Sequence, residues 1–164
     1  MLILRDSIQI NRPPEAVWRV LEDPERMSSW NPNVRAVTPI SWGGRTRGFR
    51  YQITYALSGR KNELSAEIEE YQEPVRLVIH LTGGNLPRNG YFREVYDLSK
   101  NPTGTLLTQT IQIHHSGINP FFRWVIWLLH RFGWPTGMTY LAALKDLVER
   151  GAEPPPLMHP EPRR

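Results

Sequence analysis

Hydrophobic and polar residues alternate along the middle of the chain, from residue 45 to residue 113. A period of two is typical of strands that bury one face and leave the other in water. Glycine, proline and asparagine divide the alternation at residues 58–60, 73–74, 83–90 and 100–104. Two more strand-like segments come earlier, Leu2–Ile10 and Val34–Trp42. The pattern predicts an antiparallel sheet of about seven strands with one buried face.

The turns also predict which residues face each other across the hairpins. A turn centred between Lys100 and Thr103 places Glu94 opposite Gln109, on the buried face. The same construction at the Glu73-Pro74 turn pairs apolar residues with one another: Ile68 with Leu77, Ala66 with Ile79 and Leu64 with Leu81.

Two segments of the sequence have helical patterns, one before and one after the alternating region. Residues 13–34 predict two short helices, the first ended by Asp23-Pro24 and the second by Trp30-Asn31-Pro32. Residues 138–150 predict an amphipathic helix capped by Gly151. Its small residues are expected to face the sheet and leave room for a ligand: Gly137, Ala142 and Ala143.

Three motifs resemble one known family. They are the helical pattern Pro14-x-x-Val-Trp-x-Val-Leu-x-Asp-Pro with Trp30-Asn-Pro, the segment Gly104-Thr-Leu-Leu-Thr, and Leu141-x-x-Leu-Lys-x-x-x-Glu149. With the order of elements, they resemble the START/Bet v 1-like (SRPBCC) superfamily, in particular its polyketide cyclase/dehydrase-like branch.

The resemblance implies an α+β helix-grip fold over residues 1–152. A curved antiparallel sheet would wrap around a long C-terminal helix, with two short helices after the first strand and an internal cavity. Members of the superfamily include lipid and hormone carriers, aromatic cyclases, co-chaperones and ubiquinone-binding proteins. The superfamily has no universal catalytic residue to transfer, so the resemblance implies ligand binding before any reaction.

Composition narrows the classes of protein to consider. A chain of 164 residues fits one domain, and residues 153–164, with five prolines, predict a disordered tail. The absence of cysteine excludes disulfides, thiolate metal sites and a cysteine nucleophile, and no signal peptide is evident, so we expect a cytoplasmic protein. The net charge of +4 comes from scattered basic residues, which argues against a nucleic-acid partner.

No cofactor or metal is expected. His114 and His115 are adjacent on a predicted strand and point to opposite faces, so they cannot chelate one ion. The apolar segment 121–134 contains Arg123, His130 and Arg131 and is too short and too charged for a transmembrane helix, although peripheral membrane contact stays open. The chain is expected to be a monomer or a homodimer.

Glu94 is the most unusual candidate residue, because the alternation places its carboxyl on the apolar face. It could act as a general acid or base, or it could form a structural hydrogen bond with Gln109. The expected ligand-binding set joins it to aromatic and neighbouring inward residues: Trp30, Phe49, Tyr51, Tyr55, Glu94, Tyr96, Gln109, Ile111 and Trp127.

Three hypotheses follow. The first is a cavity that binds a hydrophobic or aromatic small molecule, lipid- or polyketide-like, between sheet and helix. The second is a cyclase or dehydratase that uses Glu94. The third is a module that docks on a membrane or a protein through residues 121–134.

Overall fold

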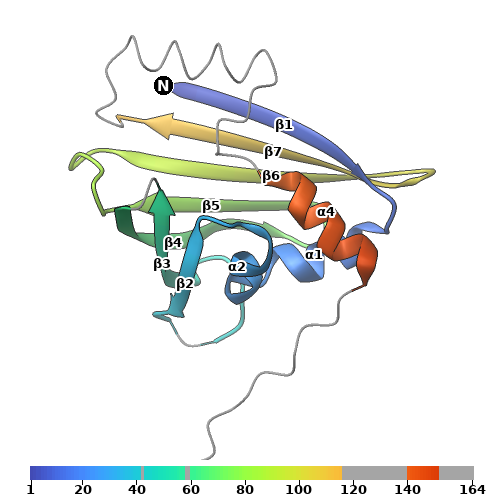
Figure 1. Cartoon of the computed structure of the whole chain (residues 1–164), viewed down its shortest axis with the longest axis horizontal. Coiled ribbons are helices and arrows are strands. Elements are labelled where there is room, and N and C mark those ends of the chain that lie inside the picture. The colour runs from blue at the N-terminus through green and yellow to red at the C-terminus, as the bar shows by residue number, and fades with distance from the viewer. Residues whose placement is uncertain (42, 58–59, 116–139, 152–164) are drawn as a thin grey trace, which may run out of the picture.

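The computed structural model describes residues 1–41, 43–57, 60–115 and 140–151. These residues form one antiparallel sheet with the order β1-β7-β6-β5-β4-β3-β2 (Figure 1). The strands are β1 (Leu2–Ile10), β2 (Val34–Pro39), β3 (Arg50–Leu57), β4 (Arg60–Gln72), β5 (Arg76–Thr82), β6 (Tyr91–Asn101) and β7 (Gly104–His114). The meander and its seven strands are therefore confirmed.

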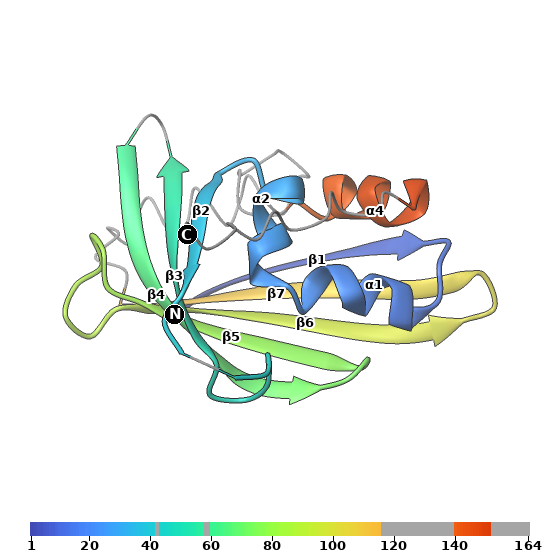
Figure 2. The same ribbon diagram turned by 90° about the horizontal axis from the view of Figure 1, so that it is seen from below.

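The helices all lie on one side of this sheet, as Figure 2 shows. They are α1 (Pro14–Leu21), the 3-10 turn η1 (Pro24–Arg26), α2 (Met27–Trp30) and α4 (Leu141–Arg150). Pro14 stands in the first turn of α1, where its missing N–H costs no hydrogen bond. The Asp23 carboxylate accepts from the Glu25 backbone N–H at 3.1 Å and so begins η1. The two predicted breaks lie where expected.

The sheet is strongly curved, and its inner, concave face holds the core. In Figure 1, β2 and β3 run steeply across the direction of β5, β6 and β7. Two irregularities in strand pairing accompany this bend. One lies in β4 between Ile68 and Glu70, and the other lies in β2 between Val34 and Ala36. Trp18, Tyr51 and similar large side chains are fully buried between the helices and this face.

The predicted hairpin registers are wrong by two residues. The last hairpin pairs Asn101 with Gly104, so Tyr96 lies opposite Gln109 and Glu94 opposite Ile111. In the β4–β5 hairpin, likewise, the structure pairs Ile68 with Ile79 and Ala66 with Leu81. A shift of two residues keeps every side chain on its face, so alternation cannot detect it.

Gly104 explains one motif of the sequence. Its φ is +135°, and a Cβ built on it would overlap the Ile10 carbonyl oxygen and lie 2.8 Å from the Arg12 nitrogen. The end of β1 therefore crosses directly over the start of β7, which a larger residue would prevent. The buried Thr105 hydroxyl donates to the Arg12 carbonyl at 2.7 Å and holds the same crossing.

Helix α4 packs against β1, α1 and α2. Its buried residues are Leu141, Leu144 and Val148, and Leu144 is fully buried. Ala142 and Ala143 are exposed, so the expectation that they face the sheet is wrong. The helix turns its leucine stripe inward, because that stripe removes more apolar surface from water than the alanines would.

Several expectations fall on residues outside the described ones. They concern Trp127, Gly137, the segment 121–134 and the proline-rich tail 153–164. Within the ranges that are described, no helix is long and apolar enough to cross a membrane.

Candidate functional site

A group of polar side chains interrupts the apolar concave face of the sheet. We call it the inner polar cluster, and it consists of Tyr51 and Tyr55 on β3, Glu94 and Tyr96 on β6, and Gln109 on β7. All five were expected from the alternation to point inward. Tyr51, Tyr96 and Gln109 are buried, whereas Tyr55 and Glu94 are half-buried.

Tyr96 is the centre of the hydrogen bonds in this cluster. Its hydroxyl lies 2.8 Å from Glu94 Oε2, to which it donates, and it accepts from the Gln109 side-chain amide at 3.0 Å. The expected hydrogen bond between Glu94 and Gln109 is therefore wrong. Because the two-residue shift in register brings Tyr96 opposite Gln109, the phenol stands between the carboxyl and the amide.

Two buried polar atoms of the cluster have no hydrogen-bond partner among the described residues. They are the Tyr51 hydroxyl and Gln109 Oε1. A buried polar atom without a partner costs free energy, and in native proteins such atoms are usually satisfied by water or a ligand. One is a hydroxyl that donates or accepts, and the other is a carbonyl oxygen that accepts.

Burial controls the charges of the cluster. Removal from water raises the pKa of Glu94, and the hydrogen bond from Tyr96 opposes that change. Burial, and then the nearby Glu94 carboxylate, raise the pKa values of Tyr51, Tyr55 and Tyr96. The phenols therefore remain protonated donors at neutral pH, while Glu94 keeps its proton more readily than an exposed glutamate.

Two features near this cluster were missed by the sequence analysis. Asp6 is half-buried on β1 directly opposite Gln109, and its position in the alternation of β1 was a sufficient signal. The Asn33 side-chain amide donates to the Tyr140 hydroxyl at the start of α4, close to Tyr55. Nothing in the local sequence predicts this second contact, because 107 residues separate its partners.

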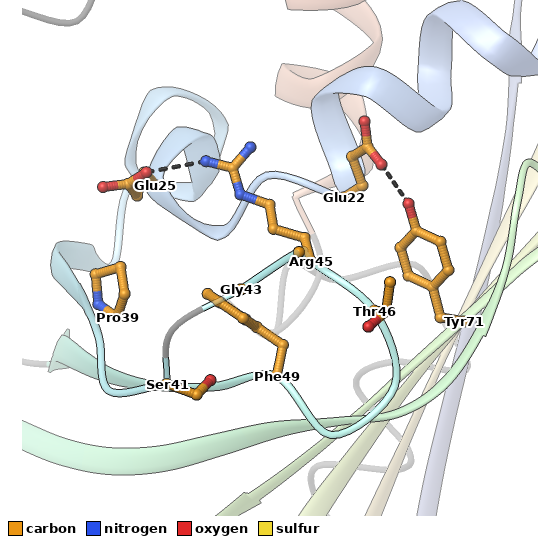
Figure 3. Close-up of a pocket in the computed structure, with 10 residues that line it drawn as sticks. Glu22, Glu25, Pro39, Ser41, Gly43, Arg45, Thr46, Phe49 and Tyr71 are labelled. Atoms are coloured by element: carbon orange, nitrogen blue, oxygen red, sulfur yellow. Dashed lines mark hydrogen bonds and ion pairs between the residues drawn. The ribbon is translucent and has the colours of Figure 1, made fainter.

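A surface pocket of about 570 Å³ lies beside the cluster, between η1 and the loop that joins β2 to β3 (Figure 3). Phe49 lines this pocket and also packs against Tyr51, with ring centroids 6.2 Å apart. One aromatic ring thus stands between the pocket and the inner polar cluster.

Ion pairs and hydrogen bonds close two sides of the pocket (Figure 3). Arg45, on the loop, lies 3.0 Å from both Asp23 and Glu25 of the η1 region. On the other side, Tyr71 donates to Glu22 at 2.5 Å, and burial, followed by that hydrogen bond, raises the pKa of Tyr71 to about 12.

The sequence of residues 1–150 matches the family model described as polyketide cyclase / dehydrase and lipid transport. The chain belongs to this family. No curated protein matches the chain in sequence. The matched residues include every described strand and helix, from β1 to α4. The resemblance noted in the motifs is therefore confirmed.

Solved structures agree with the family on the fold. The chain is similar to TTHA0849 from Thermus thermophilus, with 19% identity, 92% of this chain and 99% of that one covered, and a TM-score of 0.71. It is similar to a START superfamily protein from Mycobacterium smegmatis, with 15% identity, coverages of 93% and 100%, and a TM-score of 0.66. For Ara h 8.0201 the values are 14% identity, 89% and 96% coverage, and a TM-score of 0.65. The α+β helix-grip fold is therefore confirmed.

The remaining candidate residues occupy different parts of this family fold. Trp30 is buried at the end of α2 in the main core, and its indole nitrogen has no partner among the described residues. Ile111 belongs to a second apolar cluster, with Leu2, Leu4 and Ile113, beyond Glu94 on the same face. Membership of the family indicates that a hydrophobic ligand binds in a cavity, and these residues are the described candidates to line it.

The described residues hold no group of three or more histidine, aspartate, glutamate or cysteine side chains suited to a metal ion. Among the described residues, the polar groups of the concave face are hydroxyls, an amide and two carboxyls, those of Glu94 and Asp6. Such a set can bind the polar end of a ligand or transfer a proton.

Proposed function

We propose that this protein binds a hydrophobic or aromatic small molecule, lipid- or polyketide-like, against the concave face of its sheet. The ligand has at least one polar group, a carbonyl or hydroxyl, that reaches the inner polar cluster. Its apolar part lies against the aromatic and aliphatic side chains of the same face.

The observation that supports this proposal is the pair of buried atoms without partners, the Tyr51 hydroxyl and Gln109 Oε1. Their side chains stand among fully buried apolar residues. A ligand hydroxyl that donates to Gln109 Oε1, or a ligand carbonyl that accepts from Tyr51, would satisfy them. A few placed polar groups in an apolar surround are typical of small-molecule sites.

A second candidate function is that of a cyclase or dehydratase. It is favoured by the raised pKa of Glu94 and by the contact of its carboxyl with the Tyr96 hydroxyl. A buried carboxyl that holds its proton more readily than an exposed one can donate it to a leaving hydroxyl, and a phenol can orient the acid. Glu94 would then be the general acid and Tyr96 a positioning residue.

Native mass spectrometry of the purified protein tests the first proposal, because a bound ligand would appear as an added mass. The uncharged apolar dye Nile red provides a second measurement.

We expect Tyr51→Phe to lose affinity for a co-purified polar ligand while the dye still binds. Tyr91→Phe is the matched control, since Tyr91 lies on the opposite face of the sheet. The proposal fails if neither ligand nor dye binds the folded protein.

Glu94→Gln separates the two functions. A carrier should keep its ligand in this variant, because an amide also accepts from Tyr96. An enzyme should bind the ligand but no longer convert it. Conversion by Glu94→Gln at the rate of the unaltered protein would exclude Glu94 as the general acid.

A further inference from the structure

The outer, convex face of the sheet has a pocket of its own, of about 450 Å³. Strands β4 to β7 supply most of its lining, and the described lining residues are Met1, Glu69, His80, Tyr91, Arg93, Gln112 and His114. The inner polar cluster belongs to the opposite face, so this pocket is separate from the ligand site proposed above. Its volume lies within the range of small-molecule sites, about 300–1,000 Å³.

The register of the sheet builds this pocket. His80 lies directly opposite Arg93, and Arg93 directly opposite Gln112, so three neighbouring strands present three polar side chains side by side. Tyr91 and His114 form the adjacent pair of β6 and β7. The residues come from three separate strands, and the strand pairing brings those strands together.

The aromatic rings of the pocket are packed in a row. The Tyr91 ring stacks on His114 with centroids 4.4 Å apart and planes inclined by 9°. Its edge meets His80 at 4.9 Å and 85°. Each ring is thus held by its neighbour, and the two imidazoles are positioned before any ligand arrives.

His80 has a buried ring nitrogen without a partner. Its Nε2 atom is shielded from water and forms no hydrogen bond with any described residue. A ring N–H in this position is a donor that a bound acceptor would satisfy.

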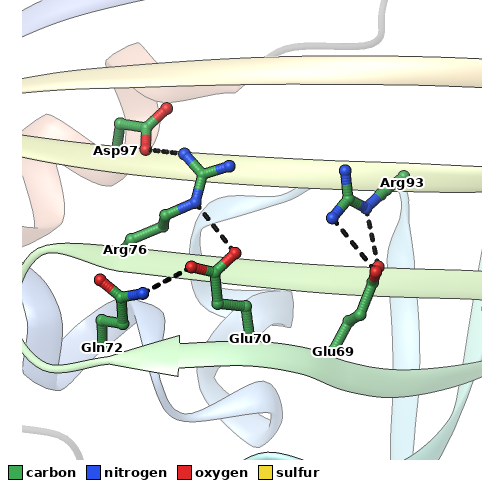
Figure 4. A network of polar contacts seen from close by, with 6 residues as sticks. All are labelled: Glu69, Glu70, Gln72, Arg76, Arg93 and Asp97. Carbon is green, nitrogen blue, oxygen red and sulfur yellow. Dashed lines mark hydrogen bonds and ion pairs between the residues drawn. The ribbon is translucent and has the colours of Figure 1, made fainter.

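Arg93 differs from Arg76, another ion-paired arginine on the same face (Figure 4). Arg76 lies between two carboxylates, Glu70 at 3.1 Å and Asp97. Arg93 contacts one carboxylate, Glu69, through Nε at 2.7 Å and Nη2 at 3.1 Å. Its Nη1 has no partner among the described residues, so part of the guanidinium stays available to an oxyanion.

Positive charge predominates beside His114. The pKa of His114 is lowered by burial first, and then by the N-terminal ammonium group, His115 and Arg93. Two carboxylates oppose this charge. Glu69 is hydrogen-bonded to Arg93, and Glu67 lies opposite His80 in the strand register. The hydrogen bond from Arg93, followed by its positive charge, in turn lowers the pKa of Glu69 against the opposing effect of burial.

We infer that this outer pocket binds an oxyanion, the carboxylate or phosphate group of a small molecule. The Arg93 guanidinium, the His80 ring N–H and the Gln112 amide are its donors, and Tyr91 is the apolar wall beside it. Guanidinium groups match carboxylates and phosphates in geometry, and charged donors form the stronger hydrogen bonds. The Glu69 carboxylate already accepts two hydrogen bonds from Arg93 and would compete with the bound oxyanion.

Titration of the full chain with inorganic phosphate and, separately, with benzoate tests this inference. The readout is the NMR signals of the His80 and His114 rings at one fixed pH, assigned with His80→Gln and His114→Gln. We expect both probes to shift both rings with saturation. Shifts that remain linear over the whole titration would overturn the site.

Three variants are expected to change the affinity for the anion in different ways. Arg93→Gln should weaken binding about tenfold or more, because it removes the fixed cation. Glu69→Gln should strengthen binding severalfold, because it removes the competing carboxylate, a gain that structural damage would not produce. Arg76→Gln is the matched control and should leave the affinity unchanged. A loss in Glu69→Gln, or equal losses in both arginine variants, would contradict the assignment.

Vesicles distinguish a free anion from a lipid headgroup. Cosedimentation with phosphatidylglycerol vesicles, but no saturable effect of phosphate or benzoate, would replace the small-molecule site with a membrane surface. Nile red binding should be the same in Arg93→Gln as in the unaltered protein. That measurement keeps failure of this inference distinct from failure of the concave-face proposal.

Discussion

The Tyr96 hydroxyl lies 2.8 Å from Glu94 Oε2, although the two residues belong to the same strand and are two positions apart. Both side chains therefore point to the concave face, where the alternation of β6 places them. The carboxyl obtains its hydrogen bond from a neighbour along the strand instead of from the strand beside it. This contact opposes the effect of burial, which raises the pKa of Glu94.

Glu94→Gln should change stability in a way that depends on pH. Burial raises the pKa of Glu94 in the folded state, so the folded protein holds this proton more tightly than the unfolded chain. The resulting stabilisation is present below the ordinary glutamate pKa of about 4.3 and is lost as the pH rises through the folded value. We expect Glu94→Gln to gain stability relative to the unaltered protein as the pH rises above about 4.

Urea unfolding at several pH values measures this difference. Glu69→Gln is the opposite control, because its carboxyl has a lowered pKa from the hydrogen bond with Arg93. That variant should lose relative stability at lower pH, as the pH rises towards the ordinary glutamate pKa of about 4.3, and should change little above it. A difference for Glu94→Gln that does not vary with pH would show that its pKa is unaltered by folding.

Tyr51→Phe and Tyr96→Phe remove one hydroxyl each from the same face, but with unequal expected costs. The Tyr96 hydroxyl bonds Glu94 and Gln109, so its loss should cost about 1–3 kcal/mol. The Tyr51 hydroxyl has no partner among the described residues, so Tyr51→Phe should be neutral or stabilising by up to about 1 kcal/mol. Thermal unfolding of ligand-free protein compares the two. Equal losses would mean that Tyr51 has a partner.

Gly104→Ala should destabilise the protein by about 2 kcal/mol or more, because it adds a clash with the Ile10 carbonyl to the strain of a positive φ. Gly43→Ala is the matched control. Its φ is +118°, but nothing lies within 4 Å of an added Cβ. Denaturant midpoints of the two variants should therefore differ clearly. Similar midpoints would assign the cost to backbone strain alone.

Leu144→Ala and Ala142→Phe test the orientation of α4. Leu144 is fully buried, so its truncation should cost about 2–5 kcal/mol. Ala142 is exposed, so a phenylalanine there should change stability by about 0.5 kcal/mol or less and should leave Nile red binding intact. Loss of dye binding in Ala142→Phe would show that this side of the helix faces the ligand.

The face of each strand residue was determined by the sequence, because side chains alternate with a period of two whatever the partner strand is. Glu94, Tyr96 and Gln109 could therefore be predicted to point inward, and Asp6 could have been found by the same signal. The breaks at Asp23-Pro24 and after Trp30 were also local, since they depend on proline and on caps.

Contacts between strands were decided by the tertiary structure. A shift of two residues leaves the alternation intact, so Glu94 opposite Ile111 and Glu94 opposite Gln109 have the same pattern in sequence. The side of α4 that faces the sheet, and the meeting of His80 with Tyr91, likewise depend on how distant segments pack. Local patterns determine which way a side chain points, whereas its partner depends on the free energy of the whole packed arrangement.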